Sequence, residues 1–346
     1  MADTALNTTI EAYLSHLSVH KRLAPLTVTR YAVGLRHLCG IGDEPAACTY
    51  VQLRSLLSRL HAGGAHPKTL ANTVSAWRGY FAWCMTQGAI ATNPALGLKT
   101  PKAKQGLPKA LMPDATAALF ANAAAVTRGA ASSDAAHHKT SAFETARALA
   151  IMELLYGAGL RSAELLSLNI AARDQGAVSE SFIHWSAKQV TVTGKGSKVR
   201  SVPLGDYALV AVKTWLEVRA EYIAAAYKNS KAELQNTSEP ALFIGKRGAR
   251  LTGTELRRIV AAFAKTAGAQ QHLHPHMLRH SYASHLLQSS GDLRAVQELL
   301  GHASIAATQI YTRLDFQHLT KVYDQAHPRA RGAHGLPPVP QASPNE

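Results

Sequence analysis

The sequence predicts a mainly helical protein of two domains, with one small antiparallel β-sheet in the second domain. The chain of 346 residues exceeds the length at which one hydrophobic core usually keeps growing. Apolar residues recur at helical spacing through most of the chain, whereas a period of two is confined to residues 181–204. We therefore expect a helical domain at residues 1–98, a linker at 99–110, a larger α+β domain at 111–330 and a disordered tail at 331–346.

Three apolar stripes predict the helices of the first domain. The first stripe has the spacing i, i+3, i+4, i+7 and consists of Ile10, Tyr13, Leu14 and Leu17. Similar stripes run through residues 51–60 and 69–87, and Asn93 with Pro94 stops the next short helix. A small all-α bundle follows from this pattern. The linker after it is rich in Lys and Pro and has no apolar period.

The second domain is predicted to begin with a helix near residue 111. Residues 122–141 are small and polar, so we expect them to form a loop. The helical pattern returns at Phe143 and runs to a glycine-rich break at residues 157–159, after which Leu165 and Leu168 indicate a new short helix.

A change of period marks the sheet of the second domain. Val190 and Val192 alternate with polar residues, the sequence GKGSK then turns the chain, and a second alternating run follows. These residues predict a β-hairpin or small antiparallel sheet. Helices are expected to resume at residues 207–227 and 254–267, and in two further runs up to Gly301.

The charge balance favours a polyanionic partner such as nucleic acid. Lys and Arg number 37 against 22 Asp and Glu, which gives a net charge of +15. Residues 1–105 contain 11 basic residues and four acidic ones. The candidate phosphate contacts in the first domain and the linker are Arg30, Lys68, Arg78, Lys102 and Lys104. Taken singly, each of them is explained equally well as part of a solvated surface.

The sequence shows no signal for export or for a membrane. The N-terminal residues lack the basic and apolar regions of a signal peptide, and no stretch approaches the ~18 apolar residues of a membrane span. Cys39, Cys48 and Cys84 form no CxxC pair and suggest no disulfide framework. We therefore expect a cytoplasmic protein without membrane insertion.

The segment LHPHMLRHSYASHLL contains a candidate anion site. His276 and Arg279 are three residues apart, so they share one face of a helix whose other face is apolar. An imidazole N–H and a guanidinium group both donate hydrogen bonds to phosphate oxygens. The spacing of His276 and His280 also suits zinc, but neither an HExxH glutamate nor a nearby cysteine accompanies them. We therefore predict no metal and no other cofactor.

Three further segments carry residues of the same chemistry. Arg161 opens a helix after the glycine-rich break, where it can bind an anion or pair with Glu164 at the surface. Lys195 lies between two glycines of the hairpin turn, where it is either solvated or placed to protonate a leaving alkoxide. His302 follows the end of a helix, and Tyr311 comes nine positions later. A tyrosine there is more often part of a core, and a phenol needs a cationic site to act as a nucleophile.

Together these motifs closely resemble the signature of the tyrosine recombinases, the lambda integrase family. GLRxxEL, GKGxKxRxVPL, HxLRHxxAxHLL and LLGHxxIxxTQIYT occur in this order, and the resemblance covers residues 8–330. The run at residues 292–330 looks like the XerC group of this family rather than XerD or a phage integrase. The chain departs from the family pattern in two places, at Arg313, where the family often has His, and in the unusual length of residues 122–141.

The resemblance implies a fold, a chemistry and a set of partners. The fold would be an N-terminal helical, SAM-like core-binding domain followed by an α+β catalytic domain. The enzyme would cut and rejoin double-stranded DNA through a 3′-phosphotyrosine, without ATP. The implied catalytic set is Arg161, Lys195, His276, Arg279, His302 and Tyr311. The implied context is a heterotetramer with XerD at a dif-like site, resolving chromosome dimers under control of FtsK.

Other functions share part of this sequence pattern. A phage or mobile-element integrase would use the same catalytic set, and a type IB topoisomerase would use the same chemistry without a defined site. A phosphohydrolase could use the anion site but would have no use for the basic helical domain. A DNA-binding protein without catalysis would be expected to lack at least one of the six residues, and all six are present.

Overall fold

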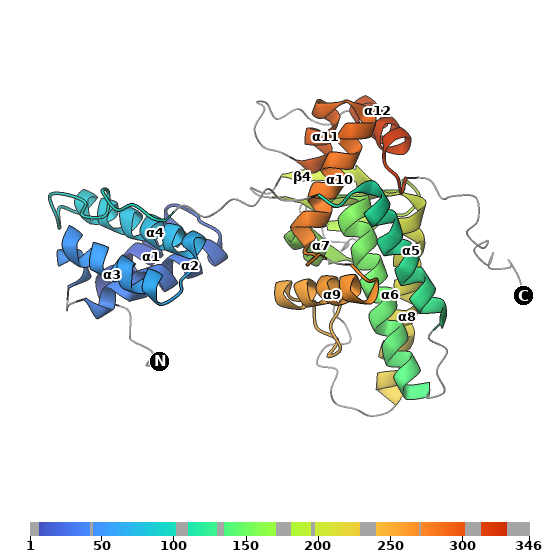
Figure 1. The fold of residues 1–346 in the computed structure, drawn as a ribbon, viewed down its shortest axis with the longest axis horizontal. Coiled ribbons are helices and arrows are strands. Elements are labelled where there is room, and N and C mark those ends of the chain that lie inside the picture. The colour runs from blue at the N-terminus through green and yellow to red at the C-terminus, as the bar shows by residue number, and fades with distance from the viewer. Residues whose placement is uncertain are drawn as a thin grey trace, which may run out of the picture. The chain divides into compact units, whose positions relative to one another are not determined.

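The computed structural model shows two compact units, Met1–Leu107 and Pro108–Glu346, each with a hydrophobic core of its own (Figure 1). It describes residues 7–41, 44–101, 110–129, 135–170, 181–194, 198–228, 240–269, 271–301 and 313–330. The predicted fold class, mainly helical with a small sheet, is confirmed. No helix in these ranges is long and apolar enough to cross a membrane.

The first unit is a bundle of helices, as the apolar stripes predict. Its elements are α1 (Thr8–Val19), α2 (Pro25–Arg36), η1 (His37–Gly40), η2 (Pro45–Ala47), α3 (Tyr50–Ala62) and α4 (Pro67–Thr86). Asn7 caps the start of α1, and Thr49 with Gln52 forms a capping box on α3. Trp77 is fully buried, and its indole N–H donates to the carbonyl of Gly34 at 2.9 Å, which joins α4 to α2. The hydrogen-bond donor of this large buried side chain thus has a partner inside the bundle's own core.

The second unit contains the longer helices and the sheet. Its helices are α5 (Pro113–Gly129), α6 (Ala135–Gly157), α7 (Ser162–Ser167), α8 (Asp206–Lys228), α9 (Gly253–Thr266), α10 (Pro275–Ser290), α11 (Leu293–Leu300) and α12 (Arg313–Ala326). Helices α6 and α8 run side by side, and α10 contacts both α6 and α12 (Figure 1). The apolar stripe predicted for α10 is confirmed, because Leu278, Tyr282 and Leu286 are fully buried.

The four strands form one sheet in the order β1-β2-β3-β4. They are β1 (Leu168–Asn169), β2 (Ser181–His184), β3 (Gln189–Thr193) and β4 (Val199–Pro203). The pairs β2–β3 and β3–β4 are antiparallel as predicted, with Val190 opposite Val202. Strand β1 instead pairs in parallel with β2, so the sheet is mixed rather than purely antiparallel.

Leu168 therefore lies at the start of a strand and not in the short helix predicted from its apolar side chain. Helix α7 ends at Ser167, and the carbonyl of Leu168 accepts from the N–H of Leu242 at 2.8 Å. The next backbone donor, Ile170 N–H, bonds to the carbonyl of Pro240 at 2.9 Å. A strand of two residues is too short to show alternation, and it is defined by its pairing with β2 and by backbone bonds to residues 240 and 242, so no local pattern indicates it.

The loop predicted for residues 122–141 is wrong over most of its length. Helix α5 continues to Gly129 and helix α6 begins at Ala135, which leaves only residues 130–134 outside the described part of the chain. The segment is rich in alanine, which is the strongest helix former although it adds little apolar bulk. The alanines favour a helix, but they add no large apolar side chains at helical spacing, so the periodicity of large apolar residues does not indicate it.

Helix α12 is attached to the rest of the second unit through Tyr323. This side chain is fully buried, its hydroxyl donates to the carbonyl of Gly157 at 2.8 Å, and the N–H of Gly205 donates to it at 3.1 Å. Burial raises the pKa of the Tyr323 phenol, so the hydroxyl keeps its proton for this bond. The contact fixes α12 against the end of α6 and the segment before α8. Helix α12 begins two residues after Tyr311, the predicted nucleophile.

Replacing Tyr323 by Phe should destabilise the second unit. The change leaves the N–H of Gly205 and the carbonyl of Gly157 without this partner in a buried site, which costs about 1–3 kcal/mol. Urea unfolding measures the loss. Tyr222→Phe is the matched control, because its hydroxyl bonds to the carbonyl of Lys246 in an exposed place, and its effect should stay within about 0.5 kcal/mol. Equal effects of the two substitutions would contradict the role of Tyr323.

Candidate active site

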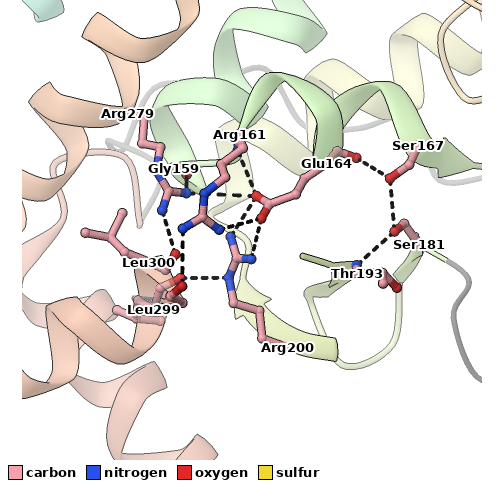
Figure 2. A network of polar contacts seen from close by, with 11 residues as sticks. Gly159, Arg161, Glu164, Ser167, Ser181, Thr193, Arg200, Arg279, Leu299 and Leu300 are labelled. Carbon is pink, nitrogen blue, oxygen red and sulfur yellow. Dashed lines mark hydrogen bonds and ion pairs between the residues drawn. The ribbon is translucent and has the colours of Figure 1, made fainter. Parts of the chain in front are cut away.

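Three arginines from distant parts of the chain meet around the carboxylate of Glu164 (Figure 2). Arg161 is the residue before α7, Arg200 lies on β4 and Arg279 lies on α10. Only 2% of the Glu164 side chain is exposed, so its charge is taken out of water and needs partners within the protein. We call these four residues the arginine cluster.

The Glu164 carboxylate accepts four hydrogen bonds. Its Oε1 accepts from Arg161 Nη1 at 2.8 Å and from Arg200 Nη1 at 2.6 Å. Its Oε2 accepts from the backbone N–H of Arg161 at 2.8 Å and from Arg200 Nη2 at 2.8 Å. Arg279 Nη1 lies 3.9 Å from Oε2, which is an ion-pair distance but not a hydrogen bond. Arg200 therefore binds both oxygens, whereas Arg279 has no bond to either.

The cluster changes the proton affinity of its own members. Burial by itself would raise the pKa of the Glu164 carboxyl, but the hydrogen bonds and charge of Arg200, with the bonds from Arg161, lower it to about 2. Burial, together with the positive charges of Arg161 and Arg200, lowers the pKa of Arg279 to about 10. Glu164 is thus a carboxylate at neutral pH and Arg279 is a cation, so the site carries fixed charge of both signs.

Backbone carbonyls hold the guanidinium groups in place. Arg279 donates through Nη1 to the carbonyl of Gly159 and through Nη2 to the carbonyl of Leu300 at 2.5 Å. Arg161 Nη2 donates to the carbonyl of Gly301 at 3.2 Å, and Arg200 Nε donates to the carbonyl of Leu299 at 3.1 Å. The end of α11 is therefore bonded to all three arginines. Its final carbonyls have no partner within the helix, which makes them ready acceptors for cations.

The glycine-rich break before Arg161 is required by close packing. Gly159 has a φ of 58°, a conformation that favours glycine, and a Cβ at this position would overlap the ring of Tyr282. The close approach brings the carbonyl of Gly159 to Arg279, three residues before Tyr282 on the same helix. Glycine thus lets the chain before α7 contact α10.

The structure brings together two of the six predicted catalytic residues, Arg161 and Arg279, within one cluster. His276 lies at the start of α10, one turn before Arg279, and its side chain is exposed. Lys195, His302 and Tyr311 lie outside the described residues. Of the three predicted residues that the structure describes, the two arginines lie in the cluster and His276 lies one turn away on α10.

The neighbours of Lys195 and His302 lie at the cluster. Gly194 precedes Lys195, and a Cβ built on it would be 3.6 Å from Glu164 Oε1. Gly301 precedes His302, and a Cβ there would be 3.0 Å from Arg200 Cδ. The residues that directly precede Lys195 and His302 therefore lie at the arginine cluster.

Sequence reasoning missed the role of two members of the cluster. The sequence indicates Glu164 only as a surface partner of Arg161, whereas in the structure it is buried and shared among the arginines. Arg200 belongs to the motif GKGxKxRxVPL, which by itself indicates no function for it. A signal was available, because Arg200 and the buried Val202 are two residues apart in a strand and so share its inward face.

The histidines near Arg279 show no metal site. Within the ranges that the structure describes, no group of three or more His, Cys, Asp or Glu side chains could hold a metal ion. His276 and His280 are both exposed, and His274 accepts a hydrogen bond from Met277 N–H at 3.2 Å as the N-cap of α10. His285 is buried and bonds to the carbonyl of Leu111 at 2.6 Å. Two of the four histidines thus have structural contacts.

The residues predicted to contact DNA differ in solvent exposure and in the hydrogen bonds that their side chains already make. Arg30 on α2 and Lys68 on α4 are exposed. The guanidinium of Arg78 is engaged with the chain after α4, where it donates to the carbonyls of Ala95 and Leu98 at 3.1 and 2.6 Å. Lys102 and Lys104 lie outside the described residues. Arg78 therefore has a structural role in the first unit, and DNA contact by each of these residues stays a prediction.

Comparison with known proteins places both units in one family. Residues 133–318 match the phage integrase family, and residues 10–88 match the N-terminal SAM-like domain of phage integrases. The chain belongs to the phage integrase family of tyrosine recombinases. It is therefore a DNA-cleaving and DNA-rejoining enzyme of site-specific recombination, as the sequence motifs predict.

Relatives within the family are tyrosine recombinases named XerC. The chain is 42% identical over 330 residues to tyrosine recombinase XerC of Ralstonia pickettii, with 93% of this chain and 94% of the relative covered. It is 43% identical over 327 residues to tyrosine recombinase XerC of Alcanivorax borkumensis, with the same coverage. The predicted resemblance to the XerC group is confirmed.

Solved structures support the same fold. The XerH site-specific recombinase bound to palindromic difH substrate, in a post-cleavage complex, matches with a TM-score of 0.55 at 23% identity, covering 91% of this chain and 83% of that one. The Tn1549 transposon integrase in complex with circular intermediate DNA also matches with a TM-score of 0.55, at 17% identity, covering 90% and 99%. At such identities the similarity is one of fold.

The arginine cluster should make the stability of this recombinase depend on pH through Glu164. Because the pKa of Glu164 in the folded protein is about 2, below its ordinary value of 4.5, its contribution is fully present above pH 4.5 and is lost as the pH falls toward 2. The difference in unfolding free energy between the wild type and Glu164→Gln should therefore shrink over that interval. Urea unfolding at a series of pH values measures it.

Glu144→Gln serves as the control for this series. It removes an ion pair with Lys246 whose side chains are both about half exposed, and such pairs contribute at most about 1 kcal/mol. A difference for Glu164→Gln that stays constant between pH 4.5 and 2 would show that the carboxylate is not held ionised by the cluster.

Proposed function

We propose that Tyr311 attacks a DNA phosphodiester and forms a 3′-phosphotyrosine. In this proposal Arg161 and Arg279 bind the non-bridging phosphate oxygens, with His276 and His302 as further hydrogen-bond donors. Lys195 protonates the leaving 5′-oxygen, and His276 accepts the proton of Tyr311. The Tyr311 Oη–P bond forms as the P–O5′ bond breaks, so one ester replaces another. Rejoining reverses these steps and requires no ATP.

The observation that carries the proposal is the convergence of Arg161 and Arg279 in one cluster. Both guanidinium groups are held by backbone carbonyls, so their positions are set before DNA arrives. In-line attack adds negative charge to the non-bridging oxygens, and preorganised cations stabilise that charge most effectively where water is limited. The Arg161 side chain is 33% exposed and the Arg279 side chain 10%, so the pair lies at the boundary between solvent and core.

Two features support the placement of the other four residues. The segments that contain Lys195 and His302 begin at Gly194 and Gly301, which lie against the cluster. His276 is one turn from Arg279 on α10, and α12 starts two residues after Tyr311. The residues before Lys195 and His302 thus lie at the cluster, and both His276 and the helix after Tyr311 belong to or pack against α10, the helix of Arg279.

We further propose a dif-like DNA site and a heterotetramer with XerD. Support comes from the XerC relatives, which match over 93% of this chain. In that setting the enzyme would act in the cytoplasm, resolving chromosome dimers under control of FtsK. The basic first unit, with exposed Arg30 and Lys68, would contact DNA phosphates without regard to sequence.

The nucleophile can be separated from its stabilisers by the covalent adduct formed on a nicked suicide substrate with a dif-like site. Tyr311→Phe should bind this DNA yet form no adduct, because only the attacking oxygen is lost. Arg279→Ala should form it on the order of 10²- to 10³-fold more slowly, as for other preorganised donors. A denaturing gel reads out both. Tyr222→Phe removes a hydroxyl outside the cluster and should behave as the wild type. An adduct formed by Tyr311→Phe would place the nucleophile elsewhere.

The role of Lys195 is tested with a substrate that has sulfur in place of the bridging 5′-oxygen. Lys195→Ala should be slow on the normal DNA but recover on this substrate, because a thiolate leaves without needing a proton. The same gel assay compares the two substrates for each variant. Arg161→Ala is the control, since loss of charge stabilisation should persist with either leaving atom. If sulfur restores Arg161→Ala and not Lys195→Ala, the general acid is not Lys195.

A further inference from the structure

Arg200 bridges three segments that carry predicted catalytic residues. It lies on β4, just after the hairpin turn of Lys195. Its guanidinium bonds to Glu164 of α7 through two nitrogens, and its Nε donates to the carbonyl of Leu299 at the end of α11. Its side chain is only 6% exposed, so these bonds are shielded from water. A solvated surface arginine would have neither this burial nor these partners.

All hydrogen-bond acceptor sites of the Glu164 carboxylate are occupied, and we call the carboxylate saturated in this sense. An ionised carboxylate offers about four lone-pair sites, and all four hydrogen bonds described for Glu164 are made by Arg161 and Arg200. Arg200 fills one site on each oxygen. Arg279 Nη1, at 3.9 Å from Oε2, is a cation close to the carboxylate but without a site on it.

Loss of Arg200 would therefore change the partner of Arg279. Two sites on a buried carboxylate would become vacant, and a buried anion without its partners is strongly unfavourable. Arg279 would need to move by only about 1 Å to reach hydrogen-bond distance from Oε2. Once bonded to Glu164, its guanidinium would be partly neutralised and turned toward the carboxylate, which would then compete with a DNA phosphate for the same donor.

We propose that Arg200 is a positioning residue of the recombination reaction, which saturates Glu164 and thereby keeps Arg279 available for the DNA phosphate. It acts through Glu164 and Arg279 and does not itself contact the phosphate. The inference rests on the proposed function only in assigning phosphate binding to Arg279.

The Arg200 side chain also contacts Gly194, which precedes Lys195, and the end of α11. Gly301 has a φ of 63°, and a Cβ on it would lie 3.0 Å from Arg200 Cδ, so the chain before His302 packs directly on Arg200. Gly194, on the other side, would place a Cβ 3.7 Å from Arg200 Nη1. Arg200 therefore lies against both Gly194 and Gly301, the residues that precede Lys195 and His302, in addition to balancing the charge of the cluster.

The test compares single and double variants by the rate of adduct formation on the suicide substrate. Arg200→Met keeps much of the side-chain volume but removes the charge, and it should slow the adduct by up to about 10²-fold while DNA binding is retained. In Arg200→Met with Glu164→Gln, the competing anion is gone, so Arg279 is free again. We expect this double variant to be about tenfold faster than Arg200→Met alone, a non-additive recovery. A purely structural role for Arg200 predicts that the second substitution slows the enzyme further.

The pH dependence provides a second readout that general damage would not change. Loss of Arg200 removes the strongest of the contacts that lower the pKa of Glu164, so this carboxyl takes up its proton at a higher pH in Arg200→Met than in the wild type, and its protonation releases Arg279. The ratio of the Arg200→Met rate to the wild-type rate should therefore rise as the pH falls. A ratio that is independent of pH, or a double variant no faster than Arg200→Met, would overturn the proposal.

Two controls distinguish the positioning of Arg279 from general damage to the core. Arg147 is an equally buried arginine of the same unit, bonded to the carbonyl of Ile244 at 2.9 Å, and Arg147→Met reports the effect of losing any buried guanidinium. If Arg200→Met does not fold, Arg200→Lys with and without Glu164→Gln gives the same comparison, because lysine cannot bind both oxygens in the bidentate manner of arginine.

Tyr311→Phe on the same gel tests the proposed nucleophile independently. An adduct in that variant refutes the nucleophile, whereas the Arg200 comparison still shows whether Glu164 and Arg279 are coupled.

Discussion

The buried carboxylate of Glu164 is the interaction on which the rest of the site depends. Three guanidinium groups near one another repel, and burial makes each charge more costly. One carboxylate with four hydrogen bonds offsets part of this repulsion and holds two of the arginines directly. Burial, together with the positive charges of Arg161 and Arg200, still lowers the pKa of Arg279 to about 10. In the proposed function a phosphate oxygen supplies further negative charge, and the cluster would be arranged for this anion before DNA is bound.

The packing of the second unit converts this local chemistry into a fixed geometry. The buried stripe of α10 places Arg279 on the face turned toward α7, and the glycine at position 159 lets the two segments approach. The carbonyls at the end of α11 bond to all three arginines, so the arginine cluster also orients this helix. Tyr323 then holds α12, which follows Tyr311, against α6. Core packing and the geometry of the arginine cluster are therefore parts of one network in this recombinase.

Much of this protein could be predicted from its sequence, because the relevant signals are local. Helical spacing of residues such as Ile10, Tyr13 and Leu17 predicts the first bundle, and a period of two predicts β3 and β4. The motifs around Arg161, Lys195 and Arg279 predict the family, which the comparisons confirm. Such features depend on residues a few positions apart, whose spacing decides which side chains share a face.

Only the tertiary structure decided the features that join distant residues. Glu164 and Arg200 are 36 positions apart, and Arg200 and Leu299 are 99 apart, so no local pattern reveals that they share one cluster. The parallel pairing of β1 depends on partners in other segments, as does the bonding of Arg78 to the chain after α4. The sequence by itself determined which residue types and helical faces were available. The fold decided which charges are buried together, because burial and the filling of a carboxylate's lone pairs depend on contacts between elements.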